Sequence, residues 1–197
     1  VNRVLTISPT TSETILGNQS LAFRNPAMNL LNTDTTTEVS FTNVKWLGNI
    51  VDDMGFNYVQ VKRGKLDYSL LYFDYGAQNI ADDAGIISGT FTPNSIVASV
   101  GWGTNLLYKG EKIDSISIGF RGKVVGHSLH TEKTEGMLFD TGLHFHKLYG
   151  IINLDFMVSN IGVVTKINGY EPEIPASVNV GFNIPIKNKW TIYNQWN

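Results

Sequence analysis

Apolar and polar residues alternate along most of the chain with a period of two, which is typical of β-strands and not of helices. In the clearest segment, Ile118 and Phe120 alternate with Ser117, Gly119 and Arg121. Clusters of Gly, Asn, Asp and Lys separate the alternating segments, as turns separate strands. The pattern predicts about nine strands in an antiparallel meander, at residues 38–46, 54–62, 65–75, 95–105, 113–125, 135–147, 151–160, 176–186 and 189–196.

One early segment departs from this pattern. In the stretch AFRNPAMNL, residues 22–30, Asn25-Pro26 opens a turn, and the residues that follow fit one turn of helix. We expect Asn25 to be the N-cap and Pro26 the first helical residue, because proline at that position costs no hydrogen bond. Two longer stretches, 76–88 and 162–175, are predicted to be loops.

Alternation alone leaves two architectures open, a membrane β-barrel and a soluble β-sandwich. The polar faces are rich in Gly and Ser with single charges, which suits a crowded barrel interior better than a solvent-facing sheet. Aromatic residues also gather near predicted strand ends, where the two membrane interfaces of a barrel would lie. These are Trp46, Tyr58, Tyr72, Tyr75, Trp102, Tyr108, Tyr149, Trp190, Tyr193 and Trp196.

Composition narrows the function classes. Only 16% of the 197 residues are charged and the formal net charge is −2, so no nucleic-acid partner is expected. The absence of cysteine excludes disulfides, thiolate metal ligands and a cysteine nucleophile. Hydrolase and nucleotide-binding motifs are missing, so we expect no catalytic residues, no enzymatic activity and no cofactor. No signal peptide begins the chain, and one is presumed to have been removed.

Two histidines are the weak candidates for a metal site. His144 and His146 lie two residues apart on one strand face that Asp140 shares, and this set could contribute metal ligands. No fourth ligand is evident. The pattern favours polar residues at a strand end, and no metal is expected.

Four charged residues are expected to face the interior of the sheet. Arg121 and Lys123 lie on the polar face of one predicted strand, and Asp140 and Asp155 lie on the polar faces of the next two. The cations could pair with these carboxylates and brace the interior, which we favour. They could also contact an anionic ligand or the carboxylate of a partner.

Several motifs occur in an order that resembles a known family. They are Leu5-Thr6-Ile7-Ser8-Pro9, Asn25-Pro26-Ala27, EVSFTNVKWLGNIVDDMGFNY, LDYSLLYFDYGAQN, GTFTPNSIVASVGWG, DTGLHFH and FMVSNIG. Together they resemble FadL-like outer-membrane barrels, in particular the PorV/PorQ branch associated with type IX secretion. Arg24 stands where that branch usually has Trp, and its Gly-Met-Gly motif is reduced to Leu16-Gly17.

The resemblance implies an all-β fold, an antiparallel transmembrane barrel of about fourteen strands in the bacterial outer membrane. Residues 1–35 would be an N-terminal plug segment with a short helix, and residues 36–197 would be barrel strands. Because about nine strands are recognised, we expect the C-terminal strands to be missing. The plug residues implied by the resemblance are Ala22, Phe23, Asn25, Pro26 and Leu30.

The resemblance also implies a non-catalytic function. A PorV-like barrel would dock or shuttle protein partners at a secretion or surface complex, in contact with outer-membrane lipid. The alternative is a FadL-like transporter of hydrophobic small molecules such as fatty acids, and a second alternative is a soluble β-sandwich binding module. The inward faces, assigned as Gly, Ser, Asn and charge, favour docking over an apolar conduit.

Overall fold

The computed structural model describes residues 25–31, 36–45, 53–108, 110–165, 172–186 and 190–196, and these form an all-β fold. In this part of the chain one nine-stranded antiparallel sheet has the order β1-β2-β3-β6-β7-β8-β9-β10-β11. Its strands are β1 (Thr37–Lys45), β2 (Met54–Arg63), β3 (Leu66–Tyr75), β6 (Asn94–Tyr108), β7 (Ser115–Leu129), β8 (Glu132–Leu148), β9 (Ile152–Val164), β10 (Ser177–Ile186) and β11 (Trp190–Trp196). Each overlaps one of the nine predicted strands, which confirms the antiparallel meander.

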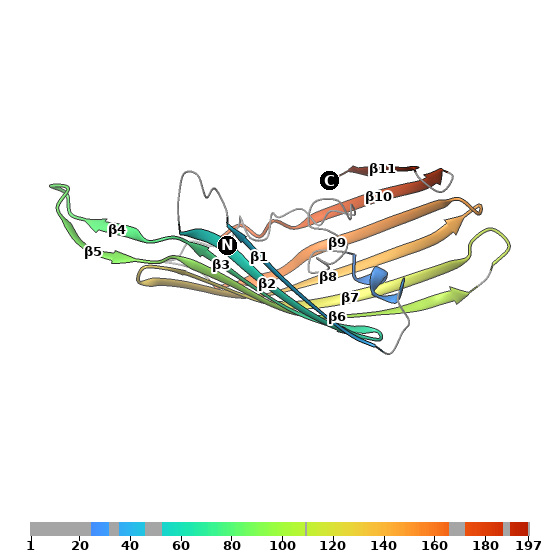
Figure 1. The fold of residues 1–197 in the computed structure, drawn as a ribbon, viewed down its shortest axis with the longest axis horizontal. Helices are drawn as coiled ribbons and strands as arrows, with labels where there is room; N and C mark the ends of the chain where they lie inside the picture. Colours follow the sequence, from blue (N-terminus) through green and yellow to red (C-terminus); the bar gives the residue numbers. More distant parts are fainter. Residues whose placement is uncertain are drawn as a thin grey trace.

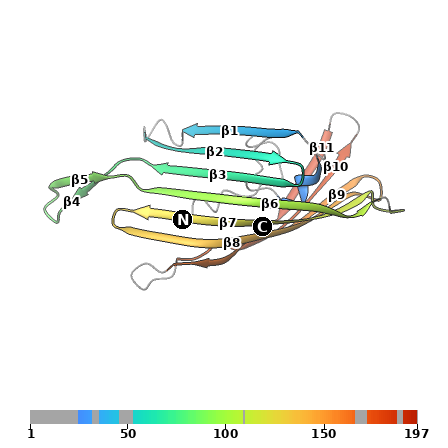
Figure 2. The same ribbon diagram turned by 90° about the horizontal axis from the view of Figure 1, so that it is seen from below.

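A hairpin interrupts the meander between β3 and β6. The strands β4 (Gln78–Ala81) and β5 (Ile87–Phe91) pair with each other and extend beyond the main sheet (Figure 1, Figure 2). The prediction of a loop at 76–88 was therefore wrong for 78–81 and 87–88, which belong to these two strands. Asp82 Oδ1 organises the turn by accepting hydrogen bonds from the backbone N–H groups of Ala84 at 3.0 Å and Ile86 at 2.8 Å, and Gly85 supplies a φ of 79°.

The connections differ between the two ends of the main sheet. At one end they are short, at 64–65, 109–114, 149–151 and 187–189. At the other end they include three longer ones, at 46–53, 76–93 and 165–176, beside the tight turn at 130–131. We call these the short-turn end and the long-loop end.

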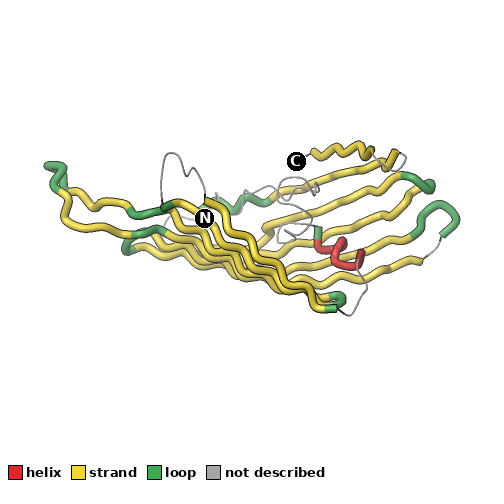
Figure 3. Tube along the Cα trace, viewed as in Figure 1, coloured by secondary structure: helices red, strands yellow, loops and turns green. Residues whose placement is uncertain are grey.

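The main sheet is curved and open. In Figure 1 and Figure 3 the 3₁₀-helix η2 (Pro26–Leu31), red in Figure 3, lies against one side of it, and η2 packs on β6, β7 and β8. We call this side the inner face and the opposite side the outer face. Among the described strands, β1 and β11 each pair with one neighbour only, so the predicted closed barrel is not observed. The described strands also do not form the two facing sheets of a sandwich.

The polarity of the two faces is the reverse of that in a soluble protein. Buried polar or charged side chains line the inner face, among them Lys62, Asp67, Ser99, Arg121, Lys123, Asp140, His144 and Asp155. Large apolar side chains are exposed along the outer face, among them Phe41, Tyr68, Leu70, Val100, Phe120, Val124, Met137, Phe139, Phe156 and Val178. Soluble proteins rarely expose a contiguous apolar surface of this extent.

The inner face also contains an apolar zone that the sequence analysis did not anticipate. Toward the long-loop end, a buried cluster is formed by Phe56, Tyr58, Leu71, Phe73, Val97, Val125 and Leu138. The interpretation of the inward faces as only Gly, Ser, Asn and charge was therefore wrong. Tyr58 and the adjoining Tyr75 belong to this zone and not to an outer aromatic girdle. We call it the inner apolar cluster.

Aromatic side chains stack across strands on the outer face. Trp102 and Phe120 stack with ring centroids 6.2 Å apart, and Phe120 and Phe139 follow at 6.0 Å. Stacked pairs of this kind add to the stability of neighbouring strands. No helix in the described part of the chain is both long and apolar enough to cross a membrane.

Candidate functional site

A row of alternating charges crosses the inner face. The strand register aligns one residue on each of six consecutive strands, from β1 through β2, β3, β6 and β7 to β8. These residues are Glu38, Lys62, Asp67, Gly101, Arg121 and Asp140. We call this the charge row. Asp67, Arg121 and Asp140 have no exposed surface. Because a buried charge needs an opposite charge or hydrogen bonds close by, the alternation of sign makes the row possible.

Gly101 lets two members of the charge row meet across an intervening strand. Arg121 Nη2 lies 3.3 Å from Asp67 Oδ1 and 3.4 Å from Asp67 Oδ2, although β6 runs between their strands. A Cβ atom on Gly101 would overlap the Asp67 carboxylate. The glycine therefore leaves the space in which this ion pair forms.

A second buried ion pair joins β7 and β8. Lys123 Nζ lies 2.6 Å from Asp140 Oδ2 and donates a hydrogen bond to Asn160 Oδ1 at 2.9 Å. The backbone N–H of Asn160 in turn donates to Asp140 Oδ1 at 2.9 Å. The expected bracing by inward charges is thus present for Lys123 and Asp140. The expected partners of Arg121 were wrong, because its carboxylate partner is Asp67 and neither Asp140 nor Asp155.

Asp155 binds a histidine and the η2 segment instead of an arginine or lysine. His144 Nδ1 lies 2.8 Å from Asp155 Oδ1, and Asn25 Nδ2 donates to the same oxygen at 3.4 Å. The rings of His144 and His146 have centroids 5.9 Å apart. No group of three or more metal-ligating side chains gathers in the described residues, and Asp140 is engaged by Lys123.

Asn25 fastens η2 to the inner face with both ends of its amide. Its Oδ1 accepts a hydrogen bond from the Ala27 backbone N–H at 3.0 Å, which is the N-cap interaction expected from the sequence. Its Nδ2 donates to the backbone carbonyl of Leu143 at 2.9 Å and to that of Phe156 at 3.1 Å. The amide therefore caps the helix and binds two neighbouring strands, β8 and β9. Asn25, Pro26 and Ala27 are all buried.

Glycines on three strands form the surface on which η2 lies. Gly103, Gly119 and Gly142 stand side by side on β6, β7 and β8. A Cβ atom on Gly119 would overlap the backbone of Pro26 and Ala27, and one on Gly142 would overlap the Asn25 side-chain amide. We call these three residues the glycine row. Glycine weakens a strand interior, so close approach of another backbone is a physical reason for its presence here.

The structure places only part of the predicted plug set. Asn25 and Pro26 lie buried on the inner face, and Leu30 lies within η2. Ala22 and Phe23 lie outside the described residues. Sequence reasoning did not single out Asp67 or the glycine row, although their positions on the polar faces of alternating strands were a usable signal.

No family model, curated protein or solved structure matches the chain.

The contact between η2 and the glycine row can be tested with an introduced reporter cysteine, because the chain contains no cysteine of its own. Ala27 is 1% exposed, so Ala27→Cys should react slowly with a water-soluble maleimide. Adding Gly119→Ala introduces a methyl group into the space of the Pro26 backbone, and it should speed labelling by about tenfold or more.

Gly122→Ala is the matched control for this substitution. Gly122 lies on the same strand but faces open space, so labelling of Ala27→Cys should remain slow. Equal labelling rates in the Gly119→Ala and Gly122→Ala backgrounds would show that η2 does not depend on the glycine row.

Loss of the Arg121–Asp67 ion pair should destabilise the sheet strongly. Arg121→Met removes the cation that lies 3.3 Å from the fully buried Asp67 carboxylate, and the free energy of unfolding should fall by about 3–5 kcal/mol. Lys147→Met removes a half-exposed pair with Asp114 and should cost at most about 1 kcal/mol. Urea unfolding followed by tryptophan fluorescence measures both, and similar losses in the two variants would contradict the structural role of the charge row.

Proposed function

We propose that this chain forms strands of an outer-membrane β-barrel of the PorV-like type, non-catalytic, which docks or shuttles protein partners at a secretion or surface complex. The observation that carries the proposal is the reversed polarity of the main sheet. Buried ion pairs line its inner face, and large apolar side chains cover its outer face.

Lipid is the environment that best accounts for the outer face. Outward apolar residues of a transmembrane barrel contact hydrocarbon, while inward residues face a polar interior. Phe41, Val124 and Met137 have exposed fractions of 66%, 55% and 68%, which in water would be a large aggregation-prone surface. Within the proposal, the open edges at β1 and β11 are paired by further strands, because unpaired backbone groups are very costly in lipid.

The difference in loop length between the two ends of the sheet supports one orientation of the sheet across the membrane. Outer-membrane barrels have short turns on the periplasmic side and longer loops on the extracellular side. The short-turn end would therefore face the periplasm, and the long-loop end, with the β4–β5 hairpin, would face the exterior. The hairpin would extend beyond the bilayer, where protein partners can reach it.

The inner face supports docking over small-molecule passage. The charge row crosses six strands, its members Arg121 and Asp67 form one ion pair, its member Asp140 forms another with Lys123, and η2 occupies the adjacent glycine row. An apolar ligand moving along this face would have to pass buried charges, which is unfavourable. An interior braced in this way holds the barrel rigid while its loops engage a partner.

Transport of a hydrophobic small molecule is the second candidate function, and the inner apolar cluster favours it. Phe56, Phe73 and Leu138 belong to a buried apolar zone at the long-loop end of the inner face. Such a zone is a suitable environment for an acyl chain. It ends where the charge row begins, so η2 and the charges would have to move before a ligand could cross.

Membrane insertion can be tested by flotation of the refolded protein with phospholipid vesicles after an alkaline wash. Phe120→Lys places a charge on the outer face and should lower the stability of the inserted state by about 2–4 kcal/mol near the bilayer midplane. Thr90→Lys, on the exposed β5 strand, should float like the wild type. Wild-type protein that stays in the aqueous fraction would overturn the membrane assignment.

The docking function can be separated from transport by native gel electrophoresis of outer membranes solubilised in mild detergent. A docking barrel should migrate in a complex much larger than its own mass, and deletion of 78–91, which contains the β4–β5 hairpin, should reduce that complex. A deletion variant that still floats with vesicles provides the control for folding. A protein that migrates alone and carries extractable fatty acid would favour the transporter instead.

A further inference from the structure

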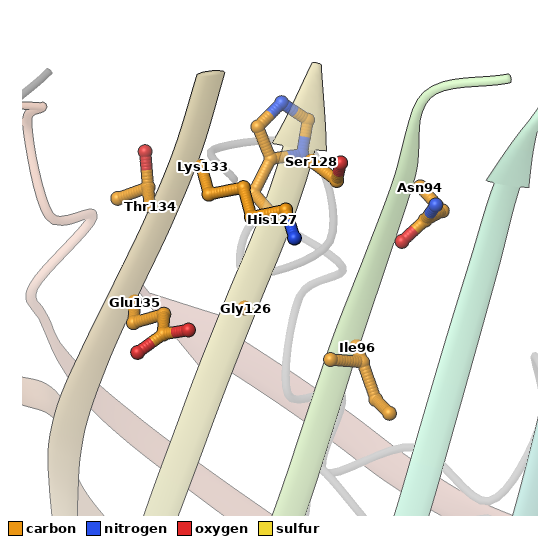
Figure 4. A pocket seen from close by; sticks show the side chains of 8 residues that line it. All are labelled: Asn94, Ile96, Gly126, His127, Ser128, Lys133, Thr134 and Glu135. Atoms are coloured by element: carbon orange, nitrogen blue, oxygen red, sulfur yellow. The ribbon is translucent and has the colours of Figure 1, made fainter. Parts of the chain in front are cut away.

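A shallow hollow lies on the outer face near the long-loop end, apart from the inner-face site. Its volume is about 300 Å³, and its lining comes from β6, β7 and β8 (Figure 4). Two rows of residues that the strand register aligns line the hollow. Its floor is formed by Ile96, Gly126 and Glu135, and its rim is formed by Asn94, Ser128 and Lys133. We call it the rim hollow.

Gly126 creates the rim hollow. A Cβ atom on this residue would lie 3.1 Å from Cγ2 of Ile96, so any larger residue would fill the space between the neighbouring strands. Figure 4 shows Lys133 and Glu135 extending from β8 toward the β7 backbone on either side of this space. The glycine thus leaves a recess bordered by one cation and one anion.

The rim hollow lies where the outer face changes from apolar to polar. The next aligned row toward the sheet centre is Ala98, Val124 and Met137, of which Val124 and Met137 have exposed fractions of 55% and 68%. The row at the rim, Asn94, Ser128 and Lys133, is polar throughout. In a membrane this boundary coincides with the level of lipid head groups.

The charges of the rim hollow are available to a ligand. Within the described residues, neither Lys133 nor Glu135 forms a side-chain ion pair. At the opposite end of the same strands, Lys147 Nζ pairs with Asp114 Oδ2 at 3.0 Å. The two ends of β8 therefore differ, because Lys147 at the short-turn end forms an ion pair and Lys133 at the rim hollow forms none with a described residue.

We propose that the rim hollow binds the head group of a phosphorylated glycolipid in the outer leaflet of the membrane. The Lys133 ammonium matches a phosphate, since a charge-assisted hydrogen bond to phosphate is among the stronger polar contacts. The Glu135 carboxylate and the side chains of Asn94 and Ser128 supply acceptors and donors for sugar hydroxyls. Ile96, Val124 and Met137 offer an apolar track for the acyl chains directly below.

This inference rests on the proposed function, because it requires the long-loop end to face the outer leaflet. A simple phosphate diester lipid would use Lys133 alone. A phosphorylated glycolipid uses the cation and the hydroxyl-binding groups together, which is why the combination of residues favours it.

Binding of lipid A to the full chain in bilayer nanodiscs, measured by native mass spectrometry, tests the inference. Lys133→Ala and Gly126→Leu should each weaken lipid A binding by about tenfold or more, the first by removing the phosphate partner and the second by filling the hollow. Lys147→Ala, at the opposite rim, should leave binding unchanged. Phosphatidylglycerol should bind at least about tenfold more weakly than lipid A.

The outcomes separate this inference from the proposed function. If the wild-type chain fails to enter bilayers, the proposed function fails. If it inserts but lipid A binding is absent, equal in Lys133→Ala, or matched by phosphatidylglycerol, the rim hollow is not a glycolipid site and the membrane assignment stands. Lys133→Ala changes an exposed residue, so its result remains informative even if Gly126→Leu does not fold.

Discussion

The buried ion pair between Arg121 and Asp67 is the interaction on which the inner face depends. Both side chains have no exposed surface, and they meet across β6 only because Gly101 carries no side chain. Removing one partner would leave a buried charge, which is far more costly than losing a surface pair. The sheet must therefore hold β3, β6 and β7 in one register, and that register sets the positions of the other inner-face groups.

The same register brings the glycine row under η2. Gly119 and Gly142 lie on β7 and β8, the strands that also supply the second ion pair, Lys123–Asp140. Asn25 then binds two strand carbonyls and Asp155, so the turn is fastened to the inner face through backbone groups and one buried carboxylate. Polar groups buried in this way stabilise one arrangement only when each has a partner.

The outer face follows from the inner one. Because side chains alternate between the two faces of a strand, each inward charge or glycine is flanked by outward residues, and those beside Asp67 and Arg121 include the apolar side chains Leu66, Tyr68 and Phe120. The proposed lipid contact, the orientation of the short-turn and long-loop ends, and the rim hollow all depend on this outer surface. The inner apolar cluster gives part of the inner face an apolar character. This cluster favours transport of a hydrophobic ligand, whereas the charge row favours docking.

The period-two pattern by itself determined the nine strands of the main sheet and the alternation of faces along them, and the Asn25-Pro26 dipeptide indicated the helical turn. The pattern did not reveal the inner apolar cluster. The alternation also placed Arg121 and Lys123 on a polar face with Asp140 and Asp155 on the polar faces of the next two strands, and the structure contains one ion pair from this set, Lys123–Asp140. The β4–β5 hairpin was missed because Asp82 forms its turn through hydrogen bonds that composition does not reveal. Only the tertiary structure decided that Arg121 pairs with Asp67, which lies 54 residues away in sequence. The physical reason is that local alternation assigns faces but does not fix the register of strands separated by a long connection, so contacts across several strands exist only once the whole sheet has formed.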